Sequence, residues 1–190
     1  SGHPIWTSST GTTSPEKCGQ LVLAYSDDDG ITWSKPINIT ESVKRLNNPE
    51  TASWGCLFDG PGNGLCMRNG TLVFPAQIWG EKHMGVLVYS KDHGKTWTSS
   101  RPMEFGGSES QVVELSDGSL LMNTREGAGG LRQVGLTKDM GQTWTRHESV
   151  NTEDGKLRNP VCQASTISVF NSIGKDNKPL YNFGMKHLLF

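Results

Sequence analysis

The sequence predicts an all-β protein built as a β-propeller. A short motif occurs three times, the chain contains 23 Gly and 6 Trp, and no long stretch has apolar residues at the helical spacing i, i+3, i+4. The copies begin at Ser26, Ser90 and Thr137, which are 64 and 47 residues apart. These distances suit blades of four short strands joined by loops of varying length.

Each copy of the motif predicts a β-hairpin. The motif reads Ser/Thr-x-Asp-x-Gly-x-Thr-Trp and follows an apolar run typical of a strand: LVLAY, GVLVY or QVGL. The carboxylate accepts nearby backbone N–H groups, the glycine supplies a positive φ, and the indole is expected to cover the turn. We therefore interpret the three aspartates as scaffold residues: Asp28, Asp92 and Asp139.

Composition excludes several classes of function. The formal net charge is -1, so no basic surface for nucleic acid is expected, and no apolar run approaches the ~20 residues of a membrane span. No C-x-x-C pair or Cys/His cluster has zinc spacing, so no metal and no cofactor are expected. The cysteines are predicted to be buried free thiols: Cys18, Cys56, Cys66 and Cys162.

The candidate site lies on a further predicted hairpin. QVVEL and SLLMN read as strands around the turn at 116–118. The numbers of facing residues in a hairpin have a constant sum, and pairing Leu115 with Ser119 gives 234. Glu109 and Arg125 give the same sum, so they are predicted to face each other at the open end of the hairpin.

Two interpretations of this pair remain open. It is either a plain cross-strand ion pair, which contributes little where exposed, or part of a functional site. Asn123 projects on the same face as Arg125 and adds a donor. Glycines on both sides would let a ligand approach the backbone: Gly106, Gly107, Gly127, Gly129 and Gly130.

Four segments together resemble bacterial exo-sialidases (neuraminidases), over nearly the whole chain. They are LVLAYSDDDGITWSKPINIT, GPGNGLCMRNGTLVFPAQ, ESQVVELSDGSLLMNTRE and RNPVCQASTISV. The repeated motif is similar to the Asp box, which some propellers without sialidase activity share. The resemblance implies a sialidase-like propeller, six-bladed in that family, of which this chain covers three to four blades. Residues 1–190 are then expected to be the central part of one catalytic domain, truncated at both ends.

The resemblance also implies roles for two residues. Glu109 matches the catalytic glutamate of the family and Arg125 the middle arginine of its triad, with the same separation of 16 residues. No position here matches the other two arginines, the aspartic acid or the nucleophilic tyrosine. They are expected before Ser1 and after Phe190, so this piece alone is expected to be inactive.

Sialic acid chemistry explains these residue types. The sugar carries a carboxylate on its anomeric carbon, which arginine binds in a bidentate manner. A carboxylate nucleophile would be repelled, so the family uses tyrosine, and this phenol needs a base such as Glu109. Retention by two displacements is the implied outcome. Further candidates for the pocket are Gln77, which would bond a substituent of the sugar, and Trp79, which would either stack on a sugar or pack against the protein.

The expected substrates are sialylated glycans of glycoproteins, glycolipids or oligosaccharides. The family resemblance implies a secreted, periplasmic or cell-surface protein, although SGHPIW is not a signal peptide. Alternatives are a trans-sialidase, a non-catalytic Asp-box propeller that binds glycan or protein, and another propeller lyase or glycosidase with a different acid/base pair.

Overall fold

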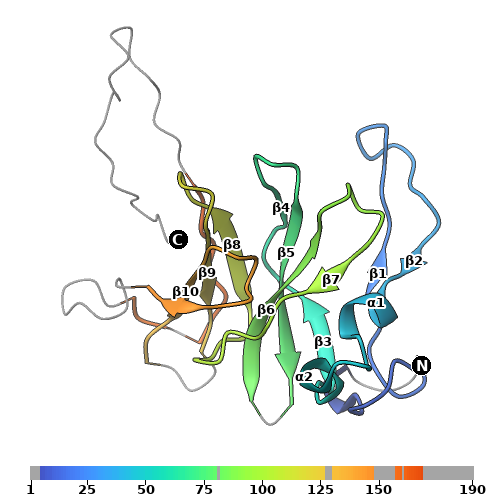
Figure 1. The fold of residues 1–190 in the computed structure, drawn as a ribbon, viewed down its shortest axis with the longest axis horizontal. Coiled ribbons are helices and arrows are strands. Elements are labelled where there is room, and N and C mark those ends of the chain that lie inside the picture. Colours follow the sequence, from blue (N-terminus) through green and yellow to red (C-terminus); the bar gives the residue numbers. More distant parts are fainter. Residues whose placement is uncertain (1–4, 81, 127–129, 148–156, 160, 169–190) are drawn as a thin grey trace, which may run out of the picture.

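Three antiparallel sheets stand side by side in the computed structural model, which describes residues 5–80, 82–126, 130–147, 157–159 and 161–168 (Figure 1). The first sheet pairs β1 (Val22–Leu23) with β2 (Ile37–Asn38). The second has the order β3-β5-β6-β7, with β4 also paired to β5. The third has the order β11-β10-β9-β8. Strands of the second sheet are β3 (Cys56–Asp59), β4 (Leu65–Cys66), β5 (Leu72–Trp79), β6 (His83–Ser90) and β7 (Thr98–Ser99).

The third sheet is a blade of four strands, as the repeat spacing predicts. Its strands are β8 (Ser110–Glu114), β9 (Leu120–Thr124), β10 (Gln133–Thr137) and β11 (Thr145–Arg146). Each strand pairs with the next one along the chain, so the first and last strands form the two edges. The all-β prediction is confirmed.

Three short helical segments were not predicted. They are a 3-10 turn (Ile5–Thr7), α1 (Thr40–Lys44) and α2 (Pro49–Ala52). The start of α2 has a clear local cause, because the Asn48 side chain accepts a hydrogen bond from the Glu50 N–H (3.0 Å) and proline occupies the first helical position. Asn-Pro-Glu is therefore a helix-start signal, but the segment is too short to show helical periodicity.

The core fills the spaces between neighbouring sheets. The strand β6 is continuously apolar because both of its faces border this core. Val86 and Val88 pack toward the first sheet, whereas Leu87 and Tyr89 pack toward the third. Both faces of this strand are thus covered, and alternation of polar and apolar residues is lost. Gly85 permits the close approach, because a Cβ there would lie 2.7 Å from the Met122 methyl group.

The three Asp-box turns share one hydrogen-bond pattern, which confirms their scaffold geometry. In the second turn, Asp92 accepts bonds from the Thr96 N–H (2.9 Å) and hydroxyl (2.6 Å), and the Ser90 hydroxyl accepts from the Gly94 N–H (2.8 Å). Gly94 has a φ of 83°. The carboxylates of Asp28 and Asp139 accept the corresponding bonds at 2.8 and 2.6 Å, and at 2.9 and 2.6 Å.

The tryptophans of these turns differ in burial. Trp97 is 5% exposed and belongs to the core between the first two sheets, as predicted, whereas Trp33 is 64% exposed. Trp33 still covers its own turn, since its indole N–H donates to the Gly30 carbonyl (3.0 Å). Its ring is exposed within the described residues because the first sheet has only two short strands around it. The indole N–H of Trp144 crosses to the carbonyl of Arg101 (3.1 Å) and links two neighbouring sheets.

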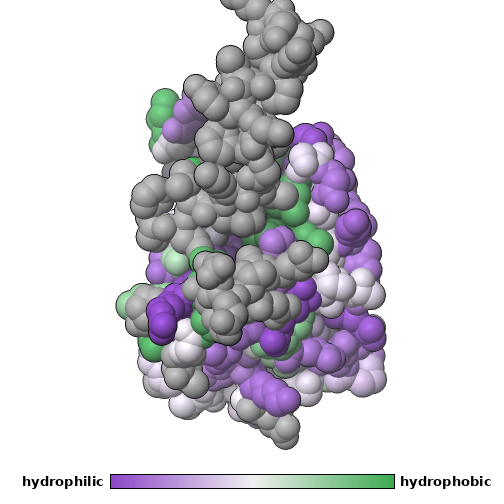
Figure 2. All heavy atoms as spheres, turned by 90° about the vertical axis from the view of Figure 1, so that its left-hand side faces the viewer, coloured by the Kyte–Doolittle hydropathy of each residue, from purple (hydrophilic) through white to green (hydrophobic). Residues whose placement is uncertain are grey.

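None of the four cysteines forms a disulfide in the described structure, but the prediction that all are buried is wrong for two of them. Cys18 and Cys56 are buried, and burial raises the pKa of the Cys56 thiol to about 11. Cys66 and Cys162 are exposed, since one lies on the two-residue strand β4 and the other in the segment that follows the third sheet. Seen from the side of the third sheet, the described surface is mainly hydrophilic with smaller hydrophobic areas (Figure 2).

Candidate functional site

The predicted register of the hairpin is confirmed. Ser110 pairs with Thr124, so the paired numbers sum to 234. One position further on, the Arg125 N–H donates to the Glu109 carbonyl (2.8 Å), and the ladder continues beyond the named strands. Arg125 Nη1 lies 3.5 Å from Glu109 Oε1, and the two side chains are 24% and 32% exposed. The pair is therefore partly shielded yet reachable.

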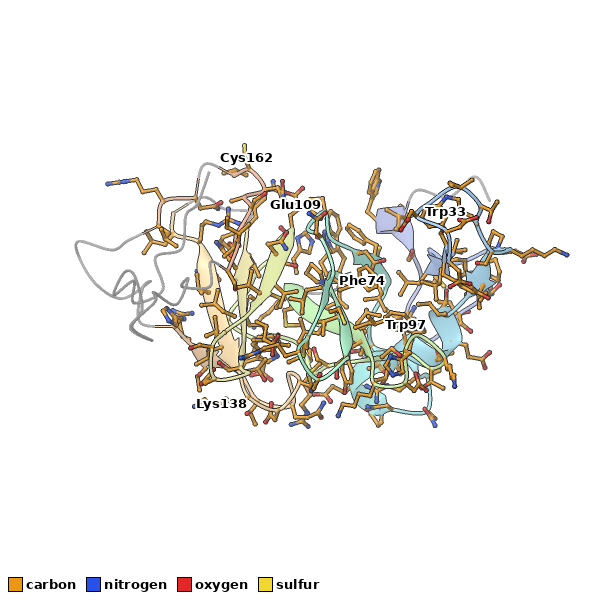
Figure 3. The ribbon with its side chains drawn as sticks, turned by 90° about the horizontal axis from the view of Figure 1, so that it is seen from above. Trp33, Phe74, Trp97, Glu109, Lys138 and Cys162 are labelled. Atoms are coloured by element: carbon orange, nitrogen blue, oxygen red, sulfur yellow. The ribbon has the colours of Figure 1, made fainter. Side chains whose placement is uncertain are left out.

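The pair lies at the end of the third sheet opposite its Asp-box turn. β10 runs from Gln133, beside Thr124, to Thr137, where the turn begins. Glu109 directly precedes β8, the edge strand formed by the start of this blade. Viewed from above, Glu109 lies far from Lys138, which adjoins the third Asp box (Figure 3). Scaffold turn and charged pair thus occupy opposite ends of the same strands.

One flanking glycine has a packing role that the sequence did not reveal. A Cβ on Gly107, whose φ is 109°, would overlap the Thr124 side chain. Glycine is therefore needed there so that the loop before β8 can lie against β9. Gly127 and Gly129 are outside the described residues.

Asn123 lies on the Arg125 side of β9, as predicted, but it is bonded within the protein. It is 2% exposed. Its Oδ1 accepts a hydrogen bond from Arg132 Nε (2.6 Å), and its Nδ2 donates to the Thr166 hydroxyl (3.2 Å). Asn123 therefore orders the layer behind the site surface.

Arg132 is a charged residue of this region that sequence reasoning missed. Val134 pairs with Asn123, and the same register places Arg132 opposite Arg125. Arg132 is 2% exposed, and its Nη1 donates to the carbonyl of Cys162 (3.0 Å). Burial lowers the pKa of Arg132, the Glu109 charge raises it, and the Arg125 charge lowers it further. The pairing of β9 with β10 would have revealed Arg132. That pairing is difficult to recognise in the sequence because a Gly-rich loop, not a tight turn, joins the two strands.

Gln77 and Trp79 lie on β5 of the second sheet, not on the hairpin of Glu109 and Arg125. Gln77 is 1% exposed; its Nε2 donates to the Gly60 carbonyl (2.9 Å), and its Oε1 accepts from Trp79 Nε1 (2.9 Å). Trp79 is half-buried and stacks on His83 with ring centroids 4.1 Å apart. Gln77 thus braces the indole, and only Trp79 of the two offers a surface.

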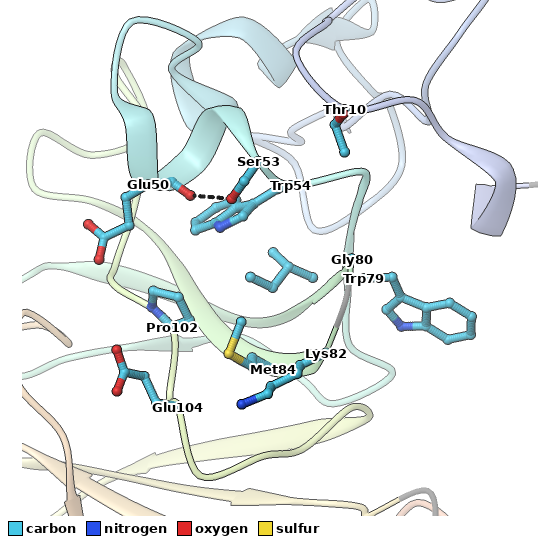
Figure 4. A pocket seen from close by; sticks show the side chains of 11 residues that line it. Thr10, Glu50, Ser53, Trp54, Trp79, Gly80, Lys82, Met84, Pro102 and Glu104 are labelled. Carbon is cyan, nitrogen blue, oxygen red and sulfur yellow. Dashed lines mark hydrogen bonds between the residues drawn. The ribbon is translucent and has the colours of Figure 1, made fainter.

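A separate hollow lies between α2 and the β5–β6 hairpin (Figure 4). Its volume is about 910 Å³, and its lining includes Trp54 and Met84 with the charged Glu50, Lys82 and Glu104. Glu50 is already paired with Arg101 at 3.2 Å. We place the candidate site at Glu109 and Arg125 instead, because a base and an anion-binding group meet there in fixed register.

The part of the chain that the structure describes contains neither a cluster of metal-binding side chains nor a membrane-spanning helix. No three His, Cys, Asp or Glu side chains there are grouped so that they would hold a metal ion. None of the described helices has the length and apolar character needed to cross a membrane.

Comparison with known proteins identifies the family. Residues 5–180 match the profile described as BNR repeat-like domain. The chain belongs to this BNR repeat-like family. It is 45% identical over 176 residues to a sialidase of Bacteroides fragilis strain YCH46, a match that covers 90% of this chain and 31% of that protein.

Solved structures agree with this assignment to the BNR repeat-like family. "Hadza microbial sialidase Hz136" superposes with a TM-score of 0.79 at 42% identity, covering 94% of this chain and 34% of the other. The leech intramolecular trans-sialidase, complexed with 2,7-anhydro-Neu5Ac, gives a TM-score of 0.63 at 29% identity over 84% of this chain and 23% of the other. The fold is part of a sialidase-like β-propeller, and the chain spans about a third of the length of the Bacteroides fragilis sialidase and of the Hz136 sialidase.

Proposed function

We propose that this chain is the central part, over residues 1–190, of the catalytic propeller of a retaining exo-α-sialidase. The observation that carries the proposal is the Glu109–Arg125 pair, held in register at the end of a blade opposite the scaffold turn. Similarity to sialidases over 90% and 94% of the chain supports it. The substrates would be terminal sialic acids on glycoproteins, glycolipids or oligosaccharides, and the protein would act in a secreted, periplasmic or cell-surface location.

Arg125 would bind the carboxylate of the sialic acid. Its contact with Glu109 is long for a charge-assisted hydrogen bond at 3.5 Å, so a ligand carboxylate can compete for the guanidinium. A planar guanidinium matches a carboxylate in bidentate geometry, which fixes the anomeric carbon relative to the blade.

Glu109 would act as the base for a tyrosine nucleophile supplied by another part of the protein. The phenol oxygen attacks the anomeric carbon, its proton passes to Glu109, and a general acid protonates the departing glycosidic oxygen. Water then attacks the anomeric carbon from the face that the glycosidic oxygen left, and gives its proton to the conjugate base of the general acid. The bond to the tyrosine oxygen breaks, Glu109 returns its proton to the phenolate, and two inversions retain the configuration. Trp79 stays a prediction for stacking on a sugar. Asn123 would support the site from behind it, and Gln77 would hold the Trp79 indole in place.

Hydrolase and transferase differ only in the acceptor. The leech neighbour is an intramolecular trans-sialidase, so product analysis is needed to separate release of free sialic acid from transfer. A non-catalytic Asp-box propeller would bind glycan without turnover of any kind.

Glu109→Ala in the full-length protein tests the proposal. Cleavage of a fluorogenic sialoside should fall by about a thousandfold or more, since the nucleophile loses its base, while the melting temperature stays close to the wild-type value. Glu104→Ala is the matched control, because Glu104 is an exposed glutamate on the loop that leads to Glu109. Wild-type turnover in Glu109→Ala would reject the assignment.

A further inference from the structure

Arg132 is the third member of a row of charges across three adjacent strands. Glu109 precedes β8, Arg125 follows β9, and Arg132 precedes β10. The two hairpin registers place the three residues beside one another, with Arg125 in the middle. Two like charges therefore face each other across β9 and β10, an arrangement that destabilises a sheet.

The Arg132 guanidinium is buried and forms no salt bridge among the described residues, although the Glu109 charge acts on it. It is 2% exposed, and none of the four ion pairs among the described residues includes it. Its bonded partners are a neutral amide, that of Asn123, and a backbone carbonyl, that of Cys162. Its Nη2 has no hydrogen-bond partner among the described residues, and neither has Arg125 Nε. A buried guanidinium costs several kcal/mol unless its charge is compensated.

Among the described residues, the other charged side chains nearby form no salt bridge with Arg132. Glu126 follows Arg125 directly, so its side chain turns to the opposite face, where Oε2 lies against Gly106. Arg158, across from Leu131, is exposed and adds positive charge. The row thus holds two guanidinium groups and one carboxylate, and it is left with a net positive charge.

We propose that Arg132 is a positioning residue for anion binding, one that strengthens the hold of Arg125 on the substrate carboxylate without touching the substrate. This inference rests on the proposed sialidase function. Asn123 and the Cys162 carbonyl fix the Arg132 guanidinium behind Arg125. Its repulsion turns the Arg125 guanidinium toward Glu109 and the open side, and its field adds to the attraction for an incoming carboxylate.

Kinetics of Arg132→Gln and Arg132→Lys in the full-length protein test this role. Glutamine removes the charge but keeps an N–H donor for Asn123, whereas lysine keeps the charge. For Arg132→Gln we expect KM for a fluorogenic sialoside to rise about tenfold with kcat nearly unchanged, because the lost attraction acts on the ground state and the transition state alike. Arg132→Lys should return KM to within about threefold of wild type. Arg146→Gln, an exposed arginine on β11 of the same sheet, is the control.

Several results would overturn the inference. A fall in kcat with unchanged KM, or failure of lysine to restore KM, would indicate a merely structural residue. Wild-type kinetics in Arg132→Gln would remove Arg132 from the site while leaving the sialidase proposal intact. Absence of sialoside turnover in the wild-type protein would reject the sialidase proposal, and the inference with it.

Asn123→Asp tests the role of Arg132 in anion binding if the Arg132→Gln protein does not fold. The new carboxylate would take the place of the amide oxygen that lies 2.6 Å from Arg132 Nε and would cancel the buried charge in place. KM should again rise about tenfold, as expected for one lost charge near the site. An unchanged KM in this variant would overturn the inference.

Discussion

The two ends of the third sheet use charge in opposite ways. At the turn, the Asp139 carboxylate is satisfied by local donors, and hydrogen bonds from Thr143 and Thr137 lower its pKa to about 2. At the other end, the Glu109 and Arg125 side chains meet only at 3.5 Å, and Arg132 Nη2 has no hydrogen-bond partner within the described part of the chain. The turn recurs three times and is complete in itself, whereas the charged row occurs once and has capacity left for a ligand.

Among the substitutions that test this difference between the two ends, Arg125→Ala should have the largest effect. Removing the guanidinium should lower kcat/KM for a fluorogenic sialoside by about a hundredfold to a thousandfold, mainly through KM, because a bidentate charge-assisted contact to the carboxylate is lost. Steady-state kinetics on the full-length protein measure this. Arg101→Ala is the control, since Arg101 is an exposed arginine paired with Glu50. If KM and kcat were both unchanged, Arg125 would have no part in binding.

Trp97→Ala compared with Trp33→Ala should give the next largest effect, on stability. Trp97 is 5% exposed in the core, so its loss should lower the free energy of unfolding by about 3–5 kcal/mol. Trp33 is 64% exposed within the described residues, and its loss should cost less than about 1 kcal/mol. Urea denaturation measures both. Equal losses would mean that residues outside the described part of the chain cover Trp33.

Local chemistry made part of this structure predictable. The Asp-x-Gly turns and the register of Glu109 with Arg125 follow from short-range rules of turn and pairing, and the structure confirms both. Burial of Cys66 was predicted wrongly, because burial depends on which distant segments cover a side chain. Arg132 was missed for a related reason, since its place in the row is set by the pairing of β9 with β10 across a Gly-rich loop.

Similar limits apply to the side chains of β5. The alternation of β5 predicts that Gln77 and Trp79 share a face, and their mutual hydrogen bond agrees with it. Gln77 Nε2 donates to the carbonyl of Gly60, which lies in the loop after β3. No local sequence pattern predicts this hydrogen bond.

The smallest effect should appear in the pH dependence of stability. The bonds from Thr96 and Ser90 lower the pKa of Asp92 to about 2, against about 3.9 in an unfolded chain. A depressed carboxyl pKa stabilises the folded state above the unfolded pKa, and this contribution is lost as pH falls from about 4 toward 2. The Asp92→Asn protein should therefore melt at a lower temperature than wild type at pH 6, and the difference should shrink as pH falls through that window.

Thermal melts at pH 2 to 6 measure the difference in melting temperature. Asp27→Asn is the control, because Asp27 takes no part in the repeated bonds of its turn. A difference that stayed constant with pH would mean that the Asp92 bonds hold the turn equally well in the protonated form.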